Sequence, residues 1–174
     1  MALFRDINVG GGHLLPMKDI VTILDSLNYE DIQTYIQSGN VVFQDNNNIS
    51  EPSANEIAKL LLDAKGFQPK VFLLSLKELQ NVIANNPFAT DNGKALHFFF
   101  LESQPHKPSI EKLTSMKVKS EEFMLCNNVF YLYTPDGIGL SKLAAGVENV
   151  LGLPMTARNW NTVSALISMA EKAQ

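Results

Sequence analysis

Apolar and polar positions follow one another along this chain in a succession of elements that occurs twice. From residue 2 to about residue 86 the pattern predicts a strand, a helix, two strands joined by a tight turn, a helix, a strand and a further helix. The same succession recurs from about residue 94 to residue 172. Apolar residues recur three and four positions apart in the helices, and β-branched and aromatic residues form short runs in the strands. The pattern therefore indicates an internal repeat.

Turn residues mark the ends of these elements. In the first half the strands are predicted at 2–9, 32–36, 41–44 and 71–74, with Gly39 in the hairpin turn and Gly66 closing a helix. In the second half they are predicted at 95–101, 122–126, 129–133 and 155–157. Asn127 suits the second hairpin turn because it tolerates a left-handed backbone. Ser141 and Asn159 suit the N-caps of the two helices that they precede.

Equivalent positions in the two halves support a duplication. Three positions of the first half, Val41, Gly66 and Leu76, correspond to Val129, Gly152 and Trp160, at an offset that shrinks slowly along the chain. Chance likeness between two generic halves is the alternative. The order βαββαβ is that of the ferredoxin-like unit. We therefore expect an α+β protein made by tandem duplication of this unit, with two mainly antiparallel sheets, helices packed on them, and subdomains at 1–88 and 93–174.

Composition narrows the class of protein. The chain has 174 residues, of which 45% are hydrophobic and 18% charged, which is typical of a globular protein. A net charge of −4 argues against general nucleic-acid binding, which needs a basic surface. Cys126 is the single cysteine, and no apolar run approaches the ~20 residues of a spanning helix. We expect a cytoplasmic protein that does not enter the membrane, and its oligomeric state stays open.

A first cluster of polar and glycine residues is predicted in the first half. In the expected topology the loop after the first strand and the hairpin turn lie at the same edge of the sheet. The candidate ligand-binding residues there are Asn8, Gly10, Gly11, Gln37, Ser38 and Asn40. Glycines allow a ligand to approach the backbone, and the start of the next helix favours an anion.

A second cluster is predicted in the second half, where the third and fourth strands both end at one edge and lead into helices. Its candidate ligand-binding residues are Ser141, Lys142, Arg158, Asn159, Trp160 and Asn161. Lys142 and Arg158 add positive charge where two helix dipoles already favour an anion. Capping and packing would explain Ser141, Asn159 and Trp160 individually, but they leave the two cations unexplained.

Other chemistries lack a motif. The histidines and Cys126 have no metal-ligand spacing, so no metal site is predicted, and His97 lies inside an apolar strand. The chain contains no nucleophile elbow, no phosphate-binding loop and no dinucleotide fingerprint. No cofactor is therefore indicated by the sequence.

Both clusters also carry a family resemblance. The segments 5–11, 16–17 and 34–43 resemble the N-terminal signature of a bacterial family of unknown function, the domain-of-unknown-function family numbered 1697. The segments 139–143 and 156–163 resemble its C-terminal signature. The resemblance spans nearly the whole chain and implies two α+β subdomains, but no established activity.

Two departures from the family pattern change the charge of the two clusters. Asp6 stands where the family usually has glycine, and it places a carboxylate beside the first cluster. Leu140 stands where the family usually has arginine, which leaves Lys142 and Arg158 as the cations of the second cluster. We therefore favour the second cluster as the site.

The sequence leaves three classes of function. The leading hypothesis is a binding module for a small anionic or phosphorylated ligand at helix N-termini. The second is an enzyme of unknown reaction, with His13 or Lys142 as proton carrier near Ser38 or Ser141 and a site between the halves. The third is a scaffold for protein or nucleic-acid interactions, in which nucleic acid is the less favoured partner because the chain is acidic.

Overall fold

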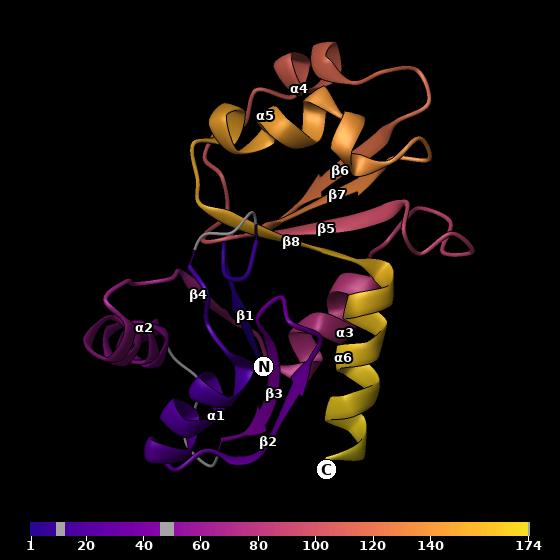
Figure 1. Cartoon of the computed structure of the whole chain (residues 1–174). Coiled ribbons are helices and arrows are strands. Elements are labelled where there is room, and N and C mark those ends of the chain that lie inside the picture. Colours follow the sequence, from indigo (N-terminus) through magenta and orange to yellow (C-terminus); the bar gives the residue numbers. More distant parts are fainter. Residues whose placement is uncertain (10–12, 46–50, 174) are drawn as a thin grey trace. The chain divides into compact units, whose positions relative to one another are not determined.

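The computed structural model describes residues 1–9, 13–45 and 51–173 (Figure 1). The first sheet is formed by β1 (Ala2–Phe4), β2 (Glu30–Tyr35), β3 (Asn40–Gln44) and β4 (Val71–Leu73). Three helices accompany it: α1 (Met17–Ser26), α2 (Glu51–Lys65) and α3 (Leu76–Ala84). The second sheet is formed by β5 (Leu96–Leu101), β6 (Glu122–Cys126), β7 (Val129–Tyr133) and β8 (Met155–Asn159). Its helices are α4 (Ile110–Met116), a 3₁₀ helix (Ile138–Leu140), α5 (Lys142–Leu151) and α6 (Trp160–Lys172).

Both sheets have the same topology. The strand order is β2-β3-β1-β4 in the first and β6-β7-β5-β8 in the second. All the neighbouring strands in these two sheets pair antiparallel. The first and third strands of each βαββαβ unit lie at the centre, which is the ferredoxin-like arrangement. The predicted α+β duplication with two antiparallel sheets is confirmed.

Several predicted strands differ from the structure at their ends, and two of these differences affect the candidate clusters. The strand predicted at 2–9 stops at Phe4, because Asp6 and Asn8 both adopt φ of 56°, which an extended strand does not allow. The strand predicted at 155–157 continues to Asn159. Arg158 is therefore a strand residue rather than a loop residue, and this determines where its side chain points.

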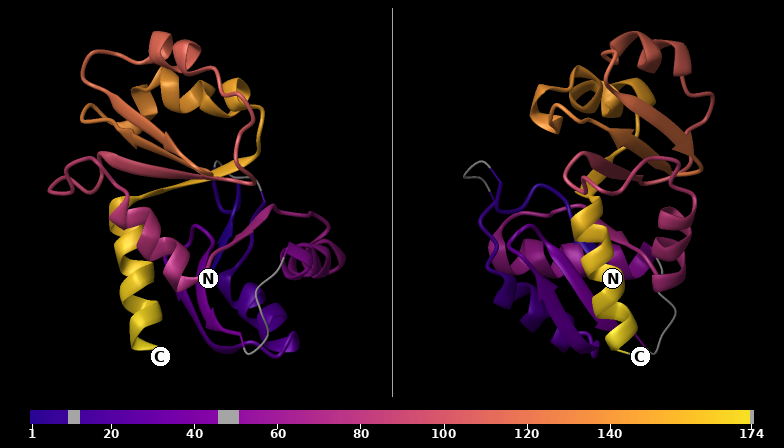
Figure 2. Two further views of the ribbon diagram at one scale, coloured as in Figure 1. Left: turned by 180° about the vertical axis from the view of Figure 1, so that it is seen from behind. Right: turned by 90° about the vertical axis from the view of Figure 1, so that its right-hand side faces the viewer.

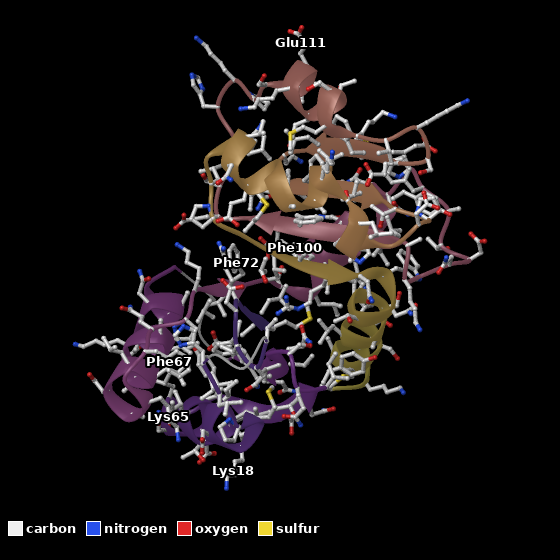
Figure 3. All side chains as sticks on the ribbon, turned by 45° about the horizontal axis from the view of Figure 1, so that its top comes forward. Lys18, Lys65, Phe67, Phe72, Phe100 and Glu111 are labelled. Carbon is white, nitrogen blue, oxygen red and sulfur yellow. The ribbon has the colours of Figure 1, made fainter. Side chains whose placement is uncertain are left out.

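Residues from one face of the first sheet pack against α1 and α2. The cluster contains Phe4, Val41 and Phe43 from the strands, with Ile20 and Leu24 from α1 and Ile57 and Leu61 from α2. Lys65 Nζ lies 2.7 Å from Asp19 Oδ2 and joins the end of α2 to α1. Figure 3 labels Lys65 and the nearby Phe67.

The second sheet is buried on both faces. On one face Phe99, Phe130 and Leu132 pack against Leu143 and Val147 of α5 and Leu113 of α4, and Figure 2 shows these two helices on the same side of the sheet. On the other face lie Phe98, Tyr131 and Phe100, the last of which is labelled in Figure 3. The Tyr131 hydroxyl donates to the carbonyl oxygen of Val82 in α3, at 3.0 Å. Such burial explains why β5 is apolar at nearly every position.

Contacts divide the chain into two compact units. One comprises Met1–Asn81 and Ser164–Gln174, and the other comprises Val82–Val163. The sequence assigned the whole last helix to the second half, whereas α6 from Ser164 onward groups with the first unit. There Gln80 Nε2 donates to Glu171 Oε1 at 3.0 Å. We keep 1–88 and 93–174 as a proposal for the bounds of the repeated subdomains.

Within the described residues, every helix is too short or too polar to cross a membrane.

Candidate functional site

The first predicted cluster is held together by the side chain of Asn8. Asn8 Nδ2 donates to the carbonyl oxygens of Leu15 and Gln37, each at 2.8 Å, and Asn8 Oδ1 accepts from the Leu15 amide at 2.8 Å. The loop after β1 therefore meets the β2–β3 turn, as the topology requires. The amide of Asn8 is occupied by these main-chain partners, so its role is to brace the edge. Gly10 and Gly11 lie outside the described residues.

The other polar residues of this cluster also support the turn. Asn40 is fully buried, and its Nδ2 donates to the Tyr35 carbonyl at 3.3 Å and to Ser38 Oγ at 3.2 Å. Gly39 adopts φ of +70°, and a Cβ there would lie 2.7 Å from Phe4 Cβ. Only glycine fits this position. Gln37 is exposed, so its side chain is open to a ligand.

The same edge carries strain and exposed apolar side chains that sequence reasoning missed. Ile36, a β-branched residue, has φ of 51°, a costly conformation for its type. Ile36 is 54% exposed, Val9 is 65% exposed and Leu14 is 74% exposed. The Arg5 guanidinium pairs with Asp6 at 2.8 Å, so that the extra carboxylate offsets the charge of this cation. The arrangement does not favour an anion.

The second predicted cluster lies where β7 and β8 end beside the start of β5. Leu96 pairs with Tyr133, and His97 pairs with Asn159. The two strands therefore finish at one edge of the sheet, on either side of β5. From this edge α6 starts directly after Asn159, and a short segment containing the 3₁₀ helix leads from β7 into α5.

Two residues of this cluster cap helices. Ser141 is buried, and its Oγ accepts from the Ala144 amide at 2.9 Å, at the start of α5. Asn159 Oδ1 accepts from the Thr162 amide at 3.0 Å, at the start of α6. Each cap satisfies one amide of the first turn and leaves the others directed out of the helix end.

The next two residues of the cluster border the loop before β5. A Cβ at Gly93 would collide with both Trp160 and Asn161, so this loop lies directly against them. The Trp160 ring also packs near Phe98, with 6.1 Å between ring centroids. Trp160 is therefore a packing residue, whereas Asn161 is exposed.

Arg158 does not lie with Lys142. Ala157 packs against the core beneath α5, and successive strand residues face opposite sides of a sheet, so Arg158 projects from the other face beside its partner Phe98. Arg158 Nη1 donates to Thr156 Oγ1 at 2.9 Å and to the Ala157 carbonyl at 2.8 Å. The sequence placed Arg158 and Ser141 in one pocket because it ended the strand at residue 157. With the strand continuing to Asn159, these two side chains belong to different faces.

His97 belongs to this edge, although the sequence set it aside as a strand residue. It is 7% exposed and shares its face with its partner Asn159. His97 Nδ1 lies 3.3 Å from the Ala95 carbonyl oxygen. Burial lowers the pKa of His97 below its usual value, and the contact with Ala95 opposes this only partly. The signal was present in the sequence, because His97 lies two and four positions before Phe99 and Leu101 and so shares a strand face with them.

The chain resembles known proteins both in sequence and in structure. A model of the family described as "Protein of unknown function (DUF1697)" matches residues 1–131. The chain belongs to this family. The conserved bacterial protein SP0830 from Streptococcus pneumoniae has a similar structure, with a TM-score of 0.64 and 21% sequence identity over 97% of this chain and 96% of that one. None of the curated proteins compared matches the chain significantly.

These findings confirm the resemblance and the fold of this DUF1697 protein. At 21% identity the structural likeness shows the fold alone. The matched range ends within β7, before Ser141, Lys142 and Asn159. The candidate site therefore depends on the geometry of this chain itself.

Proposed function

We propose that this DUF1697 protein is a cytoplasmic binding module for a small anionic ligand, held at the edge of the second sheet where β7 and β8 end. One observation carries the proposal: the pairing of Leu96 with Tyr133 and of His97 with Asn159, which brings the two strand ends to one edge. The single cysteine fits a reducing compartment.

Helix ends and one cation supply the attraction for an anion. α5 has 10 residues and α6 has 13, and both begin near this edge. The positive end of each helix dipole contributes about 0.3–1 kcal/mol toward a nearby negative charge. Lys142 is exposed at the first position of α5 and adds a full charge. Together these features favour an anion over a neutral ligand.

Polar side chains at the same edge favour a ligand that also accepts and donates hydrogen bonds. Asn161 is exposed at the start of α6, and His97 is held neutral at pH 7 by burial, which lowers its pKa. A phosphate accepts from exposed helix amides and from an ammonium group. We therefore infer a phosphorylated metabolite, and nucleotides are the first class to test.

The test is calorimetric titration with inorganic phosphate, sugar phosphates and nucleotides, using the unchanged protein and three variants. Lys142→Ala is expected to weaken binding roughly tenfold, because it removes the charge beside the helix ends. Lys18→Ala is the matched control, an exposed lysine at the second position of α1 in the first unit. Arg158→Ala is expected to leave the affinity unchanged, since its side chain lies on the other face.

Two results would reject this function. One is the absence of binding by any of these anions at low salt, where charge attraction is strongest. The other is binding that Lys142→Ala leaves unchanged.

A further inference from the structure

A groove of about 470 Å³ runs between α4 and β6, within the second unit. One wall is formed by Ile110, Thr114 and Lys117. Their spacing of four and three positions places them on one side of α4 and its C-terminal end. The other wall is formed by the four consecutive residues Glu122–Leu125 of β6. Figure 1 shows α4 and β6 in the upper part of the view.

Four consecutive strand residues line one groove only if the main chain itself forms the wall. Successive side chains point to opposite faces, so side chains alone would contribute every second residue. β6 is an edge strand, with β7 as its neighbour on one side. The wall of the groove is therefore the unpaired edge of β6.

The register shows which main-chain groups this edge presents. Asn128 and Thr134 flank β7 on its two sides. The Leu101 amide donates to the Asn128 carbonyl, and the Thr134 amide donates to the Ala95 carbonyl. The even-numbered residues of β7 therefore direct their main-chain N–H and C=O groups toward β5. Odd-numbered residues of β7 then point toward β6. Their partners are Glu122, Met124 and Cys126.

The residues between those partners, Phe123 and Leu125, thus direct their amides and carbonyls away from β7, into the groove. Among the described residues, no hydrogen bond outside the helices and strands uses the main chain of Phe123 or Leu125. The edge therefore offers two donors and two acceptors at the spacing that an added antiparallel strand needs.

The corresponding edge of the first sheet is protected, and this one is not. β2 has an irregular register between Glu30 and Gln33, and Asp31 adopts φ of 50°. Bulges and charged residues of this kind prevent pairing at an edge. The pairing of β6 with β7 is continuous, and its one charged residue is Glu122 at the first position.

We propose that β6 binds an extended peptide segment of another protein, which adds to the sheet as an antiparallel strand beneath α4. Residues opposite Phe123 and Leu125 would direct their side chains to the same face as these two, toward α4 and Ile110. Those two peptide positions are therefore apolar. This site is separate from the edge that holds Lys142, so either proposal stands without the other.

Charge determines a third peptide position. Lys117 lies at the Glu122 end of β6, since its Nζ donates to the Glu121 carbonyl at 3.0 Å, and an ammonium group has further donors. Two residues after its second apolar side chain, an antiparallel peptide lies opposite Glu121, whose carbonyl is taken by Lys117 and whose carboxylate accepts from the Val118 amide. The peptide therefore meets Lys117 there through a side chain and not through its main chain. The preferred sequence is therefore apolar, any residue, apolar, any residue, aspartate or glutamate.

The same charge argues against a second copy of this chain as the occupant. Antiparallel pairing of two β6 strands about Met124 would bring the Lys117 end against Cys126 and the turn that follows it. That turn consists of Asn127 and Asn128, which supply no carboxylate. A partner peptide with an acidic residue satisfies Lys117, whereas a second copy does not.

The experiment is a titration of ¹⁵N-labelled protein, followed by NMR, with the acetylated and amidated peptide Ser-Val-Thr-Val-Thr-Asp-Ser. We expect the amide signals of Phe123 and Leu125 to shift most, with a Kd on the order of 100 µM. N-methylation of both valines removes the N–H groups that face β6 and is expected to abolish binding. N-methylation of the threonine between them is the matched control, and binding is expected to persist.

Changes in the protein and in the peptide charge test the rest of the groove. Ile110→Asp is expected to weaken binding at least about tenfold, whereas Leu62→Asp, at a similarly exposed apolar residue of α2 in the first unit, leaves it unchanged. Replacing the peptide aspartate by lysine weakens binding about fivefold or more. Shifts that avoid β6, equal binding of the two N-methylated peptides, or dimers formed through β6 in the absence of peptide would overturn the proposal.

Discussion

Asn8 joins two segments that are 29 positions apart, because its Nδ2 donates to the carbonyl oxygen of Gln37 at 2.8 Å. The same side chain donates to and accepts from Leu15, again at 2.8 Å. One amide therefore fixes the loop after β1 against the β2–β3 turn. The loop cannot be a regular strand while Asp6 and Asn8 keep φ of 56°, so this brace replaces the sheet hydrogen bonds that the backbone lacks.

Replacing Asn8 by alanine is expected to lower the free energy of unfolding by about 2 kcal/mol. Three hydrogen bonds are lost, each worth about 1 kcal/mol, and the cost is partly offset because the freed groups can reach water. Urea denaturation measures the change. Asn149→Ala, at an exposed position of α5, is the control and should cost less than about 0.5 kcal/mol. Equal effects of the two changes would show that the brace adds no stability.

Gly39 and Gly66 form a matched pair for measuring how much stability is lost when an added Cβ collides with neighbouring atoms. Both have positive φ, +70° and +78°, but a Cβ at Gly39 would lie 2.7 Å from Phe4 Cβ, whereas no atom of the described residues would lie within 4 Å of a Cβ at Gly66. Gly66→Ala is expected to cost about 1 kcal/mol, the backbone penalty alone. Gly39→Ala adds the collision and should cost about 3 kcal/mol. Thermal and urea unfolding of both variants decide whether the collision matters.

Ser141 and Ser109 both precede a helix, but only the side chain of Ser141 caps it. Ser141 Oγ accepts from the Ala144 amide at 2.9 Å, whereas the side chain of Ser109 makes no capping hydrogen bond to α4. Ser141→Ala is expected to lower the free energy of unfolding by about 1 kcal/mol, and Ser109→Ala by only a few tenths. Urea denaturation of the two variants is the measurement, and a smaller loss at Ser141 than at Ser109 would contradict the assignment.

The order of the strands could be predicted from the sequence, because periodicity and turn residues depend only on near neighbours. Gly39 in its turn and Asn159 before its helix follow from local rules. The same rules predicted that the two edges would gather residues distant in sequence, such as Asn8 and Gln37. The duplication makes these predictions robust, since both halves must satisfy one topology.

The face on which a side chain lies could not be predicted in the same way. Arg158 and Asn159 are adjacent, and the length of β8 decides which of them faces α5. A boundary error of two residues was enough to place Arg158 with Lys142, since strand residues alternate between faces. The groove beside the edge of β6 was also beyond the sequence, because it depends on how α4 lies next to that strand.

The buried His97 predicts how stability changes with pH. Its pKa in the folded protein lies below the value of about 6.5 that it has when unfolded, because burial disfavours the charged imidazole. Between these two values the unfolded chain binds more protons, so the free energy of unfolding falls as pH falls below about 6.5 and keeps its full value above it. His97→Leu should therefore reduce the loss of stability between pH 7.5 and pH 5, as measured by urea denaturation at both values. His106→Leu, at an exposed histidine, is the control. An identical loss in His97→Leu and in the unchanged protein would show that His97 does not contribute to the pH dependence.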